Sequence, residues 1–143
     1  MSAVPPSIRG LAGRLIAIEA GSNKPLAAEE VVRVVEKLRA PLTKFAGVEG
    51  FRSLLARALA LAKADVPALK VLQVLSDGKL ERVGELAQSQ DPETLENGAI
   101  VLVAHLLGLL VTFIGQPITL RLVQDAWPEA SIDAMDLRTE ELT

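Results

Sequence analysis

AIVLVAHLLGLLVTFI, residues 99–114, is the stretch that decides the fold of this chain. It lies between Glu96 and Arg121, in a run of 24 residues that carries no formal charge when histidine is neutral. A helix that is apolar on every side is either the central helix of a packed bundle or a membrane span. A span needs about 20 predominantly apolar residues, whereas this stretch has 16 and is followed by Gly115 and Pro117. We therefore predict a central bundle helix, with a membrane span as the weaker alternative.

The ends of the central helix are marked by local signals. Asp91 can cap its first turn, Pro92 suits the first helical position and Gly115 can end the helix. These signals predict a helix over about 92–114. A further helix over about 117–127 should follow at once, so that the two form a tight helical hairpin.

The first half of the chain carries amphipathic segments with apolar residues at helical spacing. We expect Ser7 to cap the first helix, and Glu29 and Glu30 to lie in the first turn of the second, where carboxylates suit the helix dipole. Pro41 should break or kink that helix, and a third should run over about 48–65. The one-sided apolar stripes of these helices need a surface to pack on, which an all-apolar central helix provides.

A strand pair is plausible only in residues 70–83, KVLQVLSDGKLERV, where Asp77 and Gly78 form a turn signal. A loop between helices is an equal alternative, and a short helix should follow. The sequence thus predicts an all-α fold: a compact bundle of about five or six helices around the central helix, with at most one small β-hairpin. We expect one helical domain over 1–128 and an acidic C-terminal tail over 129–143.

Composition narrows the functional classes. The chain has 143 residues and no cysteine, which excludes disulfides, thiol catalysis and thiolate metal sites and fits a reducing compartment. Near the N-terminus, Arg9, Arg14 and Glu19 interrupt what would have to be the apolar core of a signal peptide. We therefore expect a cytoplasmic protein.

Small and polar residues share one stripe of the central helix. His105, Gly108, Thr112 and Gly115 are spaced by 3, 4 and 3 residues, which places them on one helix face. One interpretation, to which we give more weight, is close packing inside the chain with His105 hydrogen-bonded in the core. The other is a groove for a partner helix or an apolar ligand, formed by His105, Gly108, Thr112 and Trp127.

Catalysis has little support in the sequence. His105 is the only histidine, and no carboxylate lies within one helical turn of it, although a distant partner such as Asp125 stays open. A histidine pair for a metal is therefore excluded, and phosphate-binding and nucleophile-elbow motifs do not occur. We expect a non-enzymatic protein without a cofactor or a bound metal.

Charge is divided unevenly along the chain. Residues 1–70 hold 11 basic and 6 acidic residues, net +5, whereas residues 71–143 hold 4 and 12, net −8. Within one domain this asymmetry indicates that the second half packs across the first; between chains it would steer a basic face onto an acidic one. The basic residues are dispersed and aromatic residues are few, so we do not expect nucleic-acid binding.

The tail, residues 129–143, carries five acidic residues and one arginine. It is either loosely ordered, as termini commonly are, or it folds against a groove of its own or of a neighbouring chain. The charged residues that would meet in the second case are Arg33, Lys37, Arg52, Asp133 and Asp136.

Residues 106–129, LLGLLVTFIGQPITLRLVQDAWPE, resemble the C-terminal segment of an uncharacterised family of small helical bacterial proteins with no assigned activity. The direct resemblance covers about a sixth of the chain, with looser similarity over 50–65. It implies a bacterial source and a compact helical fold, and it carries over no catalytic residue.

Two functional hypotheses remain. The first, which we favour, is a non-enzymatic interaction module that self-associates as a homo-oligomer or binds a protein partner. The alternative is a protein that binds a small apolar ligand in a pocket lined by the central helix.

Overall fold

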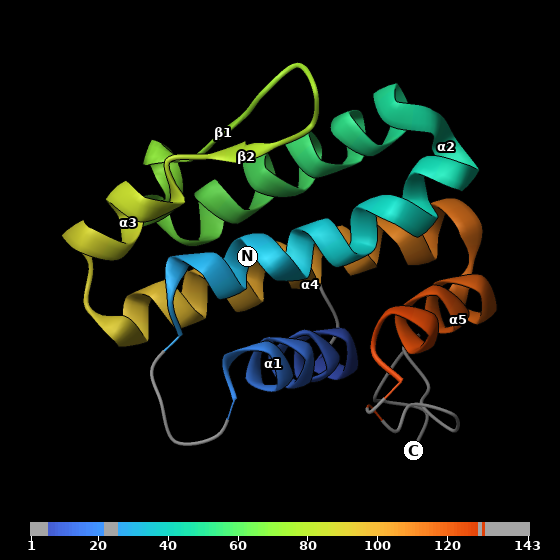
Figure 1. Ribbon diagram of the computed structural model, residues 1–143, viewed down its shortest axis with the longest axis horizontal. Coiled ribbons are helices and arrows are strands. Elements are labelled where there is room, and N and C mark those ends of the chain that lie inside the picture. Colours follow the sequence, from blue (N-terminus) through green and yellow to red (C-terminus); the bar gives the residue numbers. More distant parts are fainter. Residues whose placement is uncertain (1–5, 22–25, 129, 131–143) are drawn as a thin grey trace.

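The computed structural model describes residues 6–21, 26–128 and 130 (Figure 1). The helices and strands, in chain order, are α1 (Pro6–Ala20), α2 (Ala28–Asp65), the 3₁₀ helix η1 (Pro67–Val71), β1 (Gln73–Val74), β2 (Leu80–Glu81), α3 (Val83–Ser89), α4 (Pro92–Ile114) and α5 (Gln116–Ala126). The prediction of an all-α bundle around a central helix, with one small hairpin, is confirmed.

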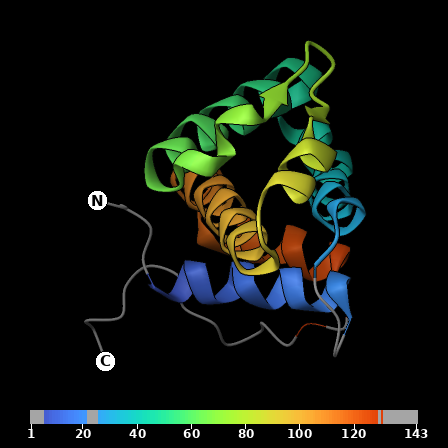
Figure 2. The ribbon, with the colours of Figure 1, turned by 90° about the vertical axis from the view of Figure 1, so that its left-hand side faces the viewer.

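Helix α4 is the central helix of the bundle. It packs against α1, α2 and α5, and Figure 2 shows it between α1 on one side and α2 on the other. Among the described residues it is the one helix long and apolar enough to cross a membrane, with a mean hydropathy of 2.2, and 56% of that apolar stretch is buried inside the chain. The core helix of a packed bundle passes the same test, and α4 packs against α1, α2 and α5 in this way.

The predicted caps of α4 are confirmed. The Asp91 carboxylate accepts a hydrogen bond of 3.2 Å from the Thr94 backbone N–H, and hydrogen bonds from Thr94 lower the pKa of Asp91. At the other end, Gly115 has φ 90°, a conformation that glycine adopts without strain. Helix α5 begins at the next residue, so α4 and α5 form the expected helical hairpin.

The expected break at Pro41 is wrong. Helix α2 continues through Pro41 and changes direction at Gly47, where φ is 77° and ψ is 171°. Leu38 and Leu42, on either side of the proline, are buried, and this packing offsets the hydrogen bond that proline cannot donate. The bend divides α2 into a first arm, 28–46, and a second arm, 48–65, which run in opposite directions in Figure 1.

The start of α1 differs from expectation, whereas the start of α2 agrees with it. Ser7 is not a cap but the second residue of α1, because Pro6 takes the first position, which suits proline. The Ser7 hydroxyl is buried and has no hydrogen-bond partner among the described residues. Glu30 lies in the first turn of α2, as predicted, and is buried. Its carboxylate accepts a bond of 2.7 Å from the Ala27 backbone N–H and so caps α2 in the manner of half a capping box.

The hairpin in the 70–83 stretch is confirmed and is held against α2. The two strands are antiparallel and pair Gln73 with Glu81 and Val74 with Leu80. In the turn, Asp77 accepts a hydrogen bond from the Lys79 backbone N–H, and Gly78 has φ 85°. Arg39 of α2 donates to the Asp77 carbonyl over 2.9 Å. A two-stranded hairpin is marginal alone, so this contact with α2 supports it.

Gly47→Ala is expected to lower the free energy of unfolding by about 1 to 2 kcal/mol, because an L side chain is strained at the backbone conformation of Gly47. Lack of room is not the cause, since an added Cβ would meet nothing within 4 Å. Urea denaturation followed by circular dichroism measures the change. Gly10→Ala is the matched control, because its Cβ would also meet nothing within 4 Å. Gly10 is helical, so this variant should raise the free energy of unfolding by up to about 1 kcal/mol. Equal losses in both variants would contradict the backbone explanation.

Candidate functional site

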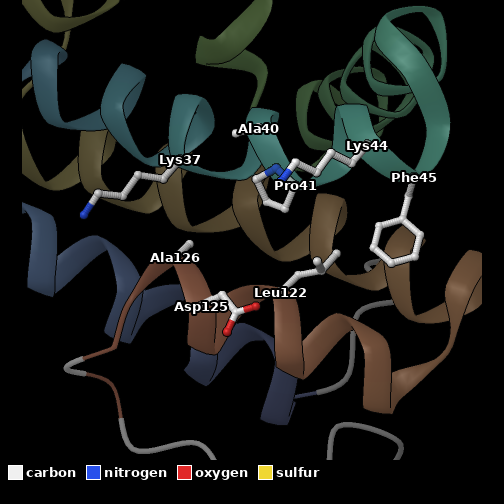
Figure 3. Close-up of a pocket in the computed structure, with 8 residues that line it drawn as sticks. All are labelled: Lys37, Ala40, Pro41, Lys44, Phe45, Leu122, Asp125 and Ala126. Atoms are coloured by element: carbon white, nitrogen blue, oxygen red, sulfur yellow. The ribbon is translucent and has the colours of Figure 1, made fainter.

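A pocket of about 400 Å³ opens between the first arm of α2 and α5. Figure 3 shows the side chains that line it, which are Lys37, Ala40, Pro41, Lys44 and Phe45 from α2 and Leu122, Asp125 and Ala126 from α5. Five of these eight residues are apolar. The volume lies in the range of pockets that hold small molecules or inserted side chains, so this pocket is the candidate functional site.

Two charges of opposite sign stand on the facing walls of the pocket. Lys44 on α2 and Asp125 on α5 are both exposed, and neither forms an ion pair with any described residue. The second lysine, Lys37, differs because its ammonium group forms an ion pair with Glu19 and lies 5.5 Å from the centre of the Trp127 ring. Lys44 and Asp125 are therefore the two pocket charges available to a partner.

Exposed apolar side chains flank two bends of the chain at one end of the bundle, and one of them, Phe45, also lines the pocket. Phe45 and Val48 flank the bend of α2, while Phe113 and Ile118 flank the break between α4 and α5; all four are exposed. Both bends lie at the same end of the molecule (Figure 1). We call these four residues the apolar end surface. Phe113 is 65% exposed and Phe45 55%, although aromatic residues of this size are usually buried.

Through its ion pair with the lining residue Lys37, the Glu19 carboxylate lies next to the pocket and joins three helical segments. Its side chain is 5% exposed. It accepts a hydrogen bond of 2.9 Å from the Trp127 indole N–H, and it pairs with Lys37 and, over 3.4 Å, with Arg33. Burial raises the pKa of Glu19. The hydrogen bonds from Lys37 and Trp127 and the charge of Lys37 together lower it by more, so the pKa lies below its usual value. Glu19, Arg33, Lys37 and Trp127, which we call the Glu19 cluster, join α1, α2 and the end of α5.

The stripe predicted on the central helix faces different neighbours along its length. His105 is buried, and its Nε2 lies 2.8 Å from Asp65 Oδ2. Thr112 is exposed, and its hydroxyl donates to the Gly108 carbonyl over 3.1 Å. Trp127 is fully buried beside Glu19. None of the four residues of the candidate groove lines the α2–α5 pocket.

The basic residues that are predicted to contact the acidic tail form ion pairs with other residues. Arg33 and Lys37 pair with Glu19, and Arg52 pairs with Glu49 over 2.7 Å. The two aspartates expected opposite them, Asp133 and Asp136, lie outside the described residues.

Sequence reasoning missed three residues that matter here. The sequence indicates Asp125 only as a distant partner of His105, Glu19 only as an interruption of an apolar segment, and Phe45 only as one of the few aromatic residues. The one available signal was the scarcity of aromatic residues, which makes each exposed one informative.

Within residues 6–21, 26–128 and 130, no group of three or more His, Asp or Glu side chains is placed to hold a metal ion. The residues that line the pocket offer apolar contact and charge pairing. Comparison of the chain with protein-family models, with curated proteins and with solved structures finds no match.

Proposed function

We propose that this protein is a non-enzymatic protein-interaction module that self-associates through the α2–α5 pocket and the adjoining apolar end surface. The observation that carries the proposal is the exposure of Phe45 and Phe113 at one end of the bundle. Aromatic side chains are enriched in protein interfaces, where they account for much of the binding energy. The pocket beside Phe45 adds a concave surface to this exposed apolar area.

The remainder of the proposal comes from the sequence. Its lack of cysteine supports a reducing compartment such as the cytoplasm, and the resemblance of residues 106–129 supports a bacterial source. Its single histidine and dispersed basic residues support a function without a metal, cofactor or nucleic acid.

Light scattering on the purified protein tests the proposal. We expect a dimer or larger assembly in which the double variant Phe45→Ser/Phe113→Ser dissociates at least about tenfold more readily, the loss typical of removing an interface hot spot. Leu61→Ser is the matched control, because Leu61 is also exposed, at 39%, but lies in the second arm of α2 away from the bend. A wild-type protein that stays monomeric at every concentration would refute self-association.

The volume of the pocket favours a second candidate function, the binding of a small apolar ligand. This pocket lies between α2 and α5 rather than on α4. A ligand that binds only the folded state raises the melting temperature. Decanol, as a probe, should then stabilise the wild type but not Ala40→Phe, in which an exposed lining residue is enlarged to fill the pocket.

A further inference from the structure

We infer that two copies of this chain pair across the α2–α5 pocket in a twofold arrangement, with Lys44 of each copy bound to Asp125 of the partner subunit. The inference rests on the proposed self-association and specifies its surface and its charge contacts. Lys44 and Asp125 lie on opposite walls of the same pocket.

A twofold interface uses the same patch on both subunits, so that patch must be complementary to itself. When the axis runs along the groove, the α2 wall of one copy faces the α5 wall of the other. Lys44 then meets Asp125 of the partner subunit, and Asp125 meets the partner's Lys44. Both residues are exposed and without an ion pair among the described residues, so neither contact requires an existing one to break.

The apolar part of the patch is complementary in the same way. Phe45 is 55% exposed and stands at the edge of the hollow that Pro41, Leu122 and Ala126 help to line. In the twofold pair, each Phe45 side chain is buried against the apolar lining of the other copy. A projecting ring beside a hollow of about 400 Å³ provides the shape match that an interface core needs.

Because Lys37 is paired with Glu19, the lining of the pocket carries no surplus positive charge. The Lys37 ammonium group belongs to the Glu19 cluster, which leaves one cation, Lys44, and one anion, Asp125, among the lining residues. A small apolar ligand would use the hollow but neither of these charges. A second copy of the chain uses both, and for that reason we assign the pocket to a second copy.

The test exchanges the two charges separately. In Lys44→Glu, each twofold contact would place Glu beside Asp125, and in Asp125→Lys each would place two lysines together. Like charges in an interface are strongly unfavourable, so both variants should dimerise at least about tenfold more weakly than the wild type. In a 1:1 mixture, a heterodimer of the two variants has opposite charges at both contacts. It should therefore form with an affinity close to that of the wild type.

Native mass spectrometry and sedimentation velocity distinguish the heterodimer from either homodimer. Mixing leaves the charges within each chain unchanged, so a recovery of dimer on mixing reports only contacts between chains. The controls are Lys70→Glu and Glu96→Lys, which make the same charge changes at exposed positions outside the pocket. Both should dimerise as the wild type does.

The outcomes separate the inference from the function on which it rests. A monomeric wild type refutes self-association and the twofold pair together. A dimeric wild type whose pocket variants dimerise normally, or whose mixture does not recover the dimer, overturns the twofold pair and places self-association on another surface.

Discussion

Replacing Trp127 with alanine is expected to lower the free energy of unfolding by about 3 to 5 kcal/mol. Trp127 is fully buried, and its indole N–H donates to the Glu19 carboxylate. The substitution therefore leaves a large cavity and removes one hydrogen bond from a buried acid. Because Trp127 is the only tryptophan, its fluorescence is lost, and urea denaturation should be followed by circular dichroism.

Two further variants divide this effect into its parts. Trp127→Phe keeps most of the apolar contact but removes the N–H donor, and it should cost about 1 to 3 kcal/mol. Leu61→Ala shortens a side chain that is 39% exposed and lies outside the proposed interface, and it should change stability by less than about 1 kcal/mol. A Trp127→Ala loss no greater than that of Leu61→Ala would contradict the burial of Trp127.

Where local signals and packing agree, the fold could be predicted from the sequence. The central helix is bounded by Asp91 and Gly115, as predicted, because a cap and a helix-ending glycine act within one turn. Pro41 is a strong local signal too, but the burial of the residues beside it overrides its effect. The bend lies instead at Gly47, immediately before residue 48, where the third helix is predicted to begin. Glycine permits a positive φ without requiring one, so its place in the bend depends on tertiary packing.

The pocket could not be predicted, because it depends on contacts between distant segments. Spacing along one helix showed that His105 and Thr112 share a face, but not which element covers that face. The partner of His105 is Asp65, 40 residues away, and Glu19 lies 108 residues before Trp127. Likewise, the α2–α5 pocket exists only because two separate helices pack side by side.

Within the part of the chain that the structure describes, four cations of the first half form their ion pairs inside that half instead of with the acidic second half. Arg33, Lys37, Arg39 and Arg52 all pair with acids of the first half of the chain. The net charge of a segment therefore predicts whether two halves of a chain attract each other, but not which residues form ion pairs. Side-chain reach along a helix determines two of these pairs, which join residues three positions apart.

Glu19→Gln is expected to cost about 2 to 3 kcal/mol at neutral pH, because it removes a charged acceptor for Lys37 and Trp127 from a side chain that is only 5% exposed. The folded protein lowers the pKa of Glu19. A carboxyl group whose pKa is lower in the folded than in the unfolded state contributes stability that is complete above its unfolded pKa. That contribution is lost as the pH falls through the folded pKa.

The cost of Glu19→Gln should therefore decrease on acidification below about pH 4.3, the usual pKa of glutamate. Urea denaturation of both proteins between about pH 7 and pH 3 measures the difference. All other carboxyl groups, Asp91 included, are present in both proteins, so their titration cancels in that difference. Glu85→Gln is the control, because Glu85 is 63% exposed and lies 3.9 Å from Arg82; its cost should stay near zero throughout. A Glu19→Gln cost that is independent of pH would assign the effect to packing instead of charge, since glutamine keeps the shape of the side chain but cannot ionise.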